Sequence, residues 1–145
     1  KDTFRFTYQI LSKNGSITAK VDSLPEMGSV PRFGIMIRSS LAQNARHVFM
    51  GLANEKSYRW VTRSNEGGKA ATKSSTMRSK NETWVRLVAK NGRITAYKSA
   101  NGTNWTYVGT TRFEMPDECY IGLAVAGGKN RNRKVATFTN VTVNP

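Results

Sequence analysis

The sequence predicts an all-β protein, folded as an antiparallel two-sheet β-sandwich or jelly roll. Many short segments alternate apolar and polar residues with a period of two, which is typical of half-buried strands. Turn-forming Gly, Asn and Pro residues separate these segments, and no long segment shows the 3.6-residue period of an amphipathic helix. No internal repeat or interdomain linker is visible, so residues 1–145 are expected to form a single domain with one core.

The first expected strand covers residues 3–10, in which every second residue from Phe4 to Ile10 is aromatic or aliphatic. Asn14-Gly15 then turns the chain into residues 17–21, which alternate in the same way. We expect these two segments to pair with each other.

Three further strands are expected before the middle of the chain. Residues 33–38 follow a loop that contains two prolines, and residues 47–52 and 57–63 are expected to form a strand pair. Residues 64–80 are rich in Gly, Ser, Thr and Lys and lack apolar periodicity. A long loop with at most one short strand is expected there.

Residues 84–109 are predicted to form three consecutive antiparallel strands. Asn91-Gly92 favours a type I′ turn, because both central residues of that turn need a positive φ. A two-residue loop sets the register, so the expected cross-strand pairs are Lys90–Arg93, Val88–Thr95, Arg86–Tyr97 and Trp84–Ser99. One face of this unit is apolar and suits the core: Val85, Leu87, Ala89, Ile94 and Ala96. The other face is basic, aromatic and hydroxylated, which suits a ligand that carries hydroxyl groups and negative charge.

Residues 120–126 and 135–143 are the last expected strands, and a basic loop joins them at residues 127–134. One face of residues 120–126 is small after Tyr120, because it holds only Gly122, Ala124 and Ala126. Small residues in mid-strand leave room above the sheet, so we expect them to form the floor of a depression.

Several segments, taken in order, resemble one family. They are residues 15–21, 34–39, 84–87, 97–109, 120–125 and 136–141. Together they resemble bacterial concanavalin A-like, or laminin-G-like, jelly-roll modules, which are appended to secreted glycoside hydrolases, polysaccharide lyases and surface proteins. The resemblance implies a concanavalin A-like fold, a carbohydrate-binding type of domain, a secreted or cell-surface bacterial protein, and a covalently linked catalytic domain in a larger parent chain.

Two features depart from the usual pattern of that family. The turn usually written Ser-x-Asp-Gly-x-x-Trp has Asn101 before Gly102 here, and the loop after Val125 is strongly basic. The extra basic charge suggests that this member serves an anionic ligand.

The charge balance points to the same class of partner. The formal net charge is +14, from 23 Lys and Arg residues against 9 Asp and Glu residues. Such an excess favours a polyanion, which means nucleic acid, an anionic membrane surface, or an acidic or sulfated polysaccharide; simple solubility is the plainer explanation.

No apolar run is long enough to span a membrane, and Lys1 opens no export leader, so any signal is expected to have been removed or to lie outside this sequence. Cys119 is the one cysteine, so no intrachain disulfide forms, and we expect it to be a small buried side chain.

No catalytic constellation stands out in the sequence. A glycosidase needs two carboxylates that flank the scissile bond, but the acidic residues lie in expected turns and at strand ends. A lyase could in principle use His47 and Tyr97, although a lone histidine that opens an apolar strand is better explained by packing or solvent contact. We therefore expect no cofactor. Calcium is common in related sandwiches, but too few clustered acids are visible to assign a site.

The outward faces of adjacent strands are expected to form one surface, and we expect the ligand to bind there. Arginine pairs with sulfate or carboxylate groups, and tyrosine or tryptophan stacks on sugar rings. The predicted central residues are Arg38, Arg63, Arg86 and Tyr97, and the supporting residues are Trp84, Lys90 and Arg93. In the competing explanation, Trp84 packs under a loop and Arg86 and Lys90 are ordinary solvated positions. The basic loop residues Lys129, Arg131, Arg133 and Lys134 are a separate candidate for steering anions.

The function hypothesis is a non-catalytic carbohydrate-binding module for an acidic or sulfated polysaccharide. A polysaccharide lyase or glycoside hydrolase of the same fold is the first alternative. A nucleic-acid-binding or surface-adhesion domain is the second, because such binders also interleave aromatic residues with arginine and lysine.

Overall fold

The computed structural model describes residues 4–11, 14–23, 32–53, 57–76, 83–114, 116–126 and 137–144. Eleven strands lie in these ranges. They are β1 (Phe4–Leu11), β2 (Gly15–Ser23), β3 (Arg32–Arg38), β4 (His47–Ala53), β5 (Ser57–Arg63), β6 (Ala71–Thr76), β7 (Trp84–Lys90), β8 (Arg93–Ser99), β9 (Thr106–Arg112), β10 (Cys119–Ala126) and β11 (Thr137–Asn144). None of the described residues belongs to a helix long and apolar enough to cross a membrane.

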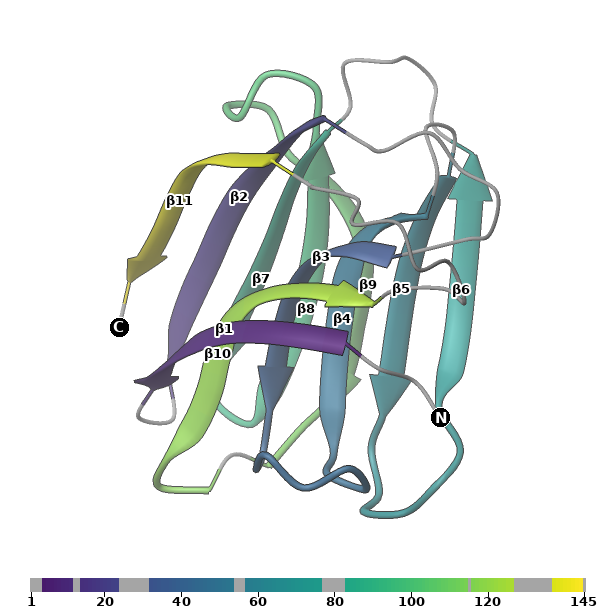
Figure 1. Cartoon of the computed structure of the whole chain (residues 1–145), viewed down its shortest axis with the longest axis vertical. Coiled ribbons are helices and arrows are strands. Elements are labelled where there is room, and N and C mark those ends of the chain that lie inside the picture. The colour runs from purple at the N-terminus through teal and green to yellow at the C-terminus, as the bar shows by residue number, and fades with distance from the viewer. Residues whose placement is uncertain are drawn as a thin grey trace.

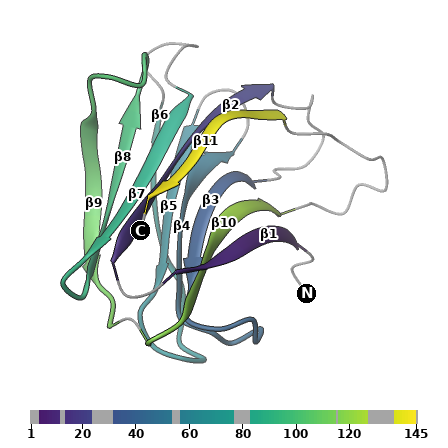
Figure 2. The same ribbon diagram turned by 90° about the vertical axis from the view of Figure 1, so that its left-hand side faces the viewer.

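The strands form two antiparallel sheets that pack face to face. One sheet has six strands in the order β1-β10-β3-β4-β5-β6, and the other has five in the order β11-β2-β7-β8-β9. The six-stranded sheet lies in front in Figure 1, and Figure 2 shows the two layers from the side. The predicted all-β, two-sheet jelly roll is therefore confirmed.

The three-stranded unit at residues 84–109 forms as predicted. β7 and β8 pair with Lys90 opposite Arg93 and Arg86 opposite Tyr97, and β9 adds to the other edge of β8. Asn91 has a φ of 53° and Gly92 a φ of 76°, as a type I′ turn requires. The predicted β4–β5 pair also forms, and the described part of the predicted loop, residues 64–76, contains the short strand β6.

The predicted pairing of the first two strands is wrong. β1 pairs with β10 in the six-stranded sheet, whereas β2 lies between β11 and β7 in the five-stranded sheet. The chain therefore passes from one sheet to the other between Leu11 and Gly15. Alternation along a strand shows which residues share a face, but it does not identify the neighbouring strand.

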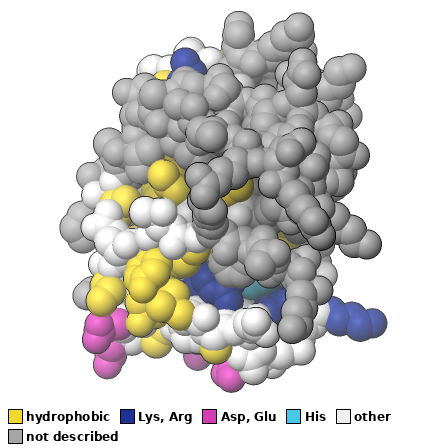
Figure 3. Space-filling view, in the orientation of Figure 1, with side chains coloured by type: hydrophobic (Ala, Val, Ile, Leu, Met, Phe, Trp, Pro, Cys, Tyr) yellow, Lys and Arg dark blue, Asp and Glu magenta, His cyan; other side chains and the backbone are white. Residues whose placement is uncertain are grey.

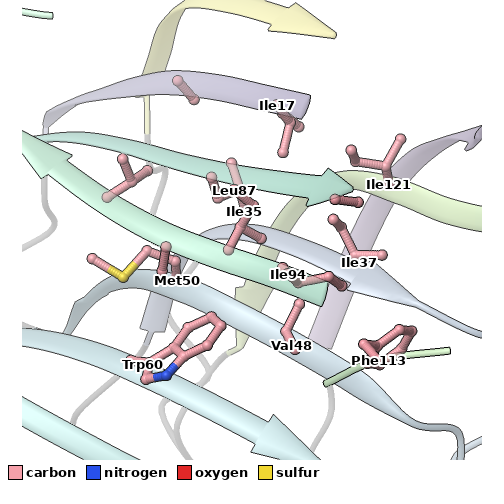
Figure 4. Packing of buried hydrophobic residues seen from close by; sticks show 14 of the residues in the cluster. Ile17, Ile35, Ile37, Val48, Met50, Trp60, Leu87, Ile94, Phe113 and Ile121 are labelled. Atoms are coloured by element: carbon pink, nitrogen blue, oxygen red, sulfur yellow. The ribbon is translucent and has the colours of Figure 1, made fainter. Parts of the chain in front are cut away.

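The core fills the space between the sheets. Ile35 and Met50 of the six-stranded sheet and Leu87 and Ile94 of the five-stranded sheet are all 0% exposed. Figure 4 shows these side chains directed toward one another from the two layers. Burial of these aliphatic side chains is the main force that holds the layers together. It stabilises the fold by about 25 cal/mol per Å² of apolar surface removed from water.

A second apolar cluster lies on the outer face of the six-stranded sheet. It joins Met36, Phe49, Val61 and Ala124, with Phe6 packed against it. Ala124 is only 1% exposed. The predicted open floor along β10 is therefore wrong at Ala124, because larger apolar neighbours cover it. The side chain of Ala126 lies outside the described residues.

Candidate functional site

The predicted binding residues divide between two opposite faces of the sandwich. Arg38 and Arg63 lie on β3 and β5 and point outward from the six-stranded sheet, whereas the others lie on β7 and β8 of the five-stranded sheet. Each sheet turns its apolar face toward the other, so the two outer faces point in opposite directions. The prediction of one shared surface is therefore wrong.

Arg38 is buried, with 3% of its surface exposed. Its Nε donates to the Ser40 carbonyl oxygen at 3.1 Å, and its Nη2 donates to the Ala42 carbonyl oxygen at 2.6 Å. Burial, and secondarily the nearby charge of Arg63, lower the pKa of the Arg38 guanidinium. Arg38 thus anchors the segment between β3 and β4, and the prediction that it rims an open surface is wrong.

Two further basic side chains lie beside Arg38 on the same face. His47 is opposite Arg38 across the β3–β4 ladder, and Arg63 is opposite His47 across the β4–β5 ladder. Nη1 of Arg63 donates to the Gln43 carbonyl oxygen at 3.0 Å, so it holds the same segment as Arg38. Figure 3 shows Lys, Arg and His side chains beside a hydrophobic patch on this face.

The outer face of the five-stranded sheet has Arg86 near its centre. The guanidinium carbon of Arg86 lies 5.6 Å from the ring centroid of Trp105, which is a cation–π distance. Tyr97 is the cross-strand neighbour of Arg86. Nε of Arg86 is buried and has no hydrogen-bond partner. Arg86 is therefore fixed by an aromatic ring instead of by an acidic side chain.

Aromatic side chains frame this arginine on two sides. The rings of Trp84 and Trp105 meet edge to face with centroids 6.5 Å apart, and those of Tyr97 and Tyr107 meet edge to face at 6.4 Å. Tyr107 is 58% exposed. These five residues, Arg86, Trp84, Tyr97, Trp105 and Tyr107, are called the Arg86 site below.

The Arg86 site includes two residues outside the predicted binding set, Trp105 and Tyr107. Trp105 immediately precedes β9, and Tyr107 follows it two positions later within the strand. In an extended chain this spacing places both side chains on one face. That spacing was the signal available in the sequence. A tryptophan that follows a turn is more often a structural plug, so the spacing alone does not predict a binding role for Trp105.

A hydrogen-bonded turn supports Trp84 from the side. Oγ of Ser99 accepts the backbone N–H groups of Asn101 and Gly102, and Oδ1 of Asn101 accepts the N–H groups of Thr103 and Asn104. The Asn101 amide oxygen thus serves as the acceptor that an aspartate would provide. A Cβ at Gly102 would lie 2.9 Å from the Trp84 ring, so only glycine fits there.

Three basic residues form a row at the other end of this face. Lys90, Arg93 and Arg112 are neighbours across β7, β8 and β9, and all three are exposed. This set is called the basic row below. Hydroxyl oxygens of Thr95 and Thr110 lie 3.1 Å apart between the basic row and the Arg86 site.

Comparison with known proteins adds information on the fold. No protein-family model and no curated protein matches this sequence. A functionally unknown protein from Saccharomyces cerevisiae superposes with a TM-score of 0.71 at 16% identity, over 95% of this chain and 72% of that chain. The likeness shows that the two chains share the two-sheet jelly-roll fold.

Two further solved structures share this jelly roll. Sheep galectin-11, in complex with glycerol, has a TM-score of 0.59 at 8% identity, over 95% of this chain and 96% of that chain. A mutant GH43 protein from Bacillus licheniformis has a TM-score of 0.58 at 18% identity, over 91% of this chain and 26% of that chain. At these identities the likeness concerns the fold.

The remaining candidate groups of the jelly roll are buried or lie outside the described residues. Cys119 is 0% exposed, its Sγ donates to the Leu11 carbonyl oxygen at 3.3 Å, and burial raises the pKa of its thiol to about 11. Within the described ranges, no group of three or more His, Cys, Asp or Glu residues is placed to hold a metal ion. The basic loop at residues 127–134 lies outside the described residues.

Proposed function

We propose that this chain is a non-catalytic carbohydrate-binding module that recognises an acidic or sulfated polysaccharide through the Arg86 site. One observation carries the proposal. Arg86 is half-buried, its guanidinium carbon lies 5.6 Å from the centroid of the Trp105 ring, and its buried Nε has no hydrogen-bond partner. A charged group held in this way is prepared to bind an anion, because the aromatic contact has already fixed its orientation.

The surrounding side chains suit a sugar that carries the anion. A carboxylate or sulfate accepts paired hydrogen bonds from a guanidinium. Tyr97 and Tyr107 offer aromatic surface for the C–H faces of a sugar ring, and the Thr95–Thr110 pair offers hydroxyl groups nearby. The net charge of +14 attracts polyanions to the molecule over a longer range.

The fold comparison supports a carbohydrate ligand as well. A galectin and a GH43 protein are among the structures that share this jelly roll. A fold hosts many functions, so this support is by analogy, and the choice of an anionic ligand rests on the Arg86 site. Since such polysaccharides lie outside cells, the proposal implies a secreted or cell-surface protein.

The residue types on the outer face of the five-stranded sheet support a module without catalytic activity. The side chains described on the outer faces of β7, β8 and β9 include no Asp, Glu or His. Hydrolysis of a glycosidic bond by the usual mechanism needs two carboxyl groups about 5–9 Å apart. The module is therefore expected to release no reducing ends and no unsaturated uronates from any polymer that it binds.

The test is affinity electrophoresis through gels that contain alginate, pectin, carrageenan, fucoidan or a neutral glucan. We expect retardation in at least one anionic gel and free migration in the neutral gel. Arg86→Ala is expected to weaken binding by about 10- to 100-fold, since a hydrogen bond to a charged group contributes about 1.5–3 kcal/mol. Arg86→Lys keeps the charge but loses the planar fork, so it is expected to bind almost as poorly.

The matched control is Arg63→Ala, which removes the same charge from the opposite face. It is expected to keep the retardation of the wild-type protein. Equal loss of binding in Arg63→Ala and Arg86→Ala would show that only net charge matters and would overturn the site. Free migration in every polysaccharide gel, together with tight binding of single-stranded DNA, would overturn the carbohydrate proposal in favour of nucleic acid.

A further inference from the structure

We infer that the ligand is a linear polyanion longer than one sugar, which lies along β7 and β8 with one anionic group at the Arg86 site and another at the basic row. This inference rests on the proposed function and adds the length and direction of the ligand. It comes from three features of the same face: the separation of the two cationic groups, the crowding of charge in the basic row, and the turn that closes one end.

The separation of the two cationic sites determines the minimum length of a ligand that occupies both. Arg86 and Lys90 lie on the same face of β7, four residues apart. A strand rises about 3.3 Å per residue, so their Cα atoms are about 13 Å apart. One sugar with a single anionic substituent cannot reach both sites. A ligand that occupies both must therefore be an oligomer with repeated negative charge.

The three neighbouring cations of the basic row favour an anionic partner more strongly than one surface cation does. Lys90 faces Arg93, and Arg93 faces Arg112, across adjacent strands. Like charges directly opposite each other in a sheet are destabilising. All three side chains are exposed, so a sulfate or carboxylate of the ligand can reach them and would relieve their repulsion.

The turn at residues 100–104 indicates the direction in which the bound ligand extends from Arg86. Gly102 of this turn lies against the Trp84 ring, at the end of the face opposite the basic row. The Thr95–Thr110 hydroxyl pair lies on the path from Arg86 to the basic row. A chain bound at Arg86 is therefore expected to extend over these hydroxyl groups toward Arg93 and away from Trp84.

The experiment is isothermal titration with carrageenan oligosaccharides and oligogalacturonates, each as disaccharide, tetrasaccharide and hexasaccharide. We expect affinity to rise at least about tenfold with length in the series that binds. The variant Arg93→Gln/Arg112→Gln should remove this gain, so that the tetrasaccharide and hexasaccharide bind no more tightly than the disaccharide. Arg86→Ala should weaken every length.

The control for lost charge is Arg63→Gln/Lys69→Gln, which removes two positive charges away from this face. It should keep the length dependence. The extended ligand would be overturned if the disaccharide bound as tightly as the hexasaccharide, or if the two double variants had equal effects. In either case, binding that depends on Arg86 would still support the proposed function. Failure of every oligosaccharide and polymer to bind would instead overturn the proposed function, and this inference with it.

Discussion

Gly102 decides the shape of one end of the Arg86 site. Its φ of 77° lies in the left-handed region, where a side chain is strained, and a Cβ there would also meet the Trp84 ring at 2.9 Å. Gly67 has a similar φ of 71° but has nothing within 4 Å of the same position. A side chain at either glycine would therefore cost backbone strain, but only a side chain at Gly102 would also collide with Trp84.

Gly102→Ala is expected to lower the free energy of unfolding by about 2–4 kcal/mol, and Gly67→Ala by about 1–2 kcal/mol. The additional cost at Gly102 comes from displacement of Trp84. Urea denaturation followed by circular dichroism measures both losses, and Gly102→Ala should also shift the tryptophan emission of the native state. Equal losses in the two variants would show that Trp84 moves aside freely.

Cys119 combines complete burial with a thiol whose pKa is raised to about 11. The folded protein therefore keeps the thiol proton between about pH 9 and pH 11, whereas the unfolded chain releases it. Stability falls with rising pH wherever the folded state binds more protons, so the stabilising contribution is present below pH 9 and is lost as the pH rises toward 11.

Wild-type protein is expected to lose about 2 kcal/mol more than Cys119→Ala between pH 8 and pH 11, because the variant has no thiol to ionise. Urea denaturation at each pH measures this difference. At pH 8 the native thiol should also react with a disulfide reagent far more slowly than the urea-unfolded thiol. Parallel pH profiles of the two proteins would contradict the raised pKa.

At the scale of the elements, β9 shows how a local irregularity changes what a face presents. Tyr107 pairs with Tyr97 and Gly109 with Ala96, so Val108 is an extra residue in the ladder. This β-bulge switches the alternation of the strand. Val108 turns toward the core, and Thr110 and Arg112 come to the outer face with Tyr107. A strict two-residue period from Tyr107 would have placed Arg112 inward.

The packing of β9 on β5 depends on the absence of a side chain at Gly109. A Cβ at this position would lie 2.6 Å from Nε1 of Trp60, which comes from the opposite sheet. Gly109→Ala is therefore expected to cost about 1–3 kcal/mol through overpacking. Trp60→Phe removes the clashing part of the ring, so the double variant should be more stable than the sum of the two single losses predicts. Additive losses in urea denaturation would rule out this contact as the cause.

Across the whole molecule, the charge of +14 acts on stability as well as on binding. Like charges repel in the compact state, and salt screens them over a Debye length of about 10 Å at 0.1 M. The melting temperature is therefore expected to rise as NaCl increases from 10 to 300 mM. A fall over this range would contradict net self-repulsion.

Lys69→Glu tests the same repulsion at one exposed site in the loop between β5 and β6. Reversing one charge on a strongly basic surface is expected to stabilise the protein by a few tenths of a kcal/mol at low salt. The gain should vanish in 1 M NaCl, where the Debye length is about 3 Å. Lys69→Gln is the control and should give roughly half the low-salt gain. A gain that persists in 1 M NaCl would point to a local contact instead.

The sequence by itself determined the local features of this protein. The β7–β8 register follows from Asn91-Gly92, since a two-residue turn leaves the strands one alignment. The alternation of residues 84–99 likewise separated the core side chains from Arg86, Tyr97 and the basic end of the hairpin. These features depend on residues close together in the chain, so sequence patterns can report them.

Only the tertiary structure decided which segments meet. It paired β1 with β10, placed Arg38 and Arg63 on the opposite layer from Arg86, and buried Arg38 beneath the carbonyl groups that follow it. It also brought Arg112 beside Arg93 through a bulge. Alternation specifies the side of a strand that a residue occupies, but strand partners depend on contacts between segments far apart in the chain, which compete for one shared core.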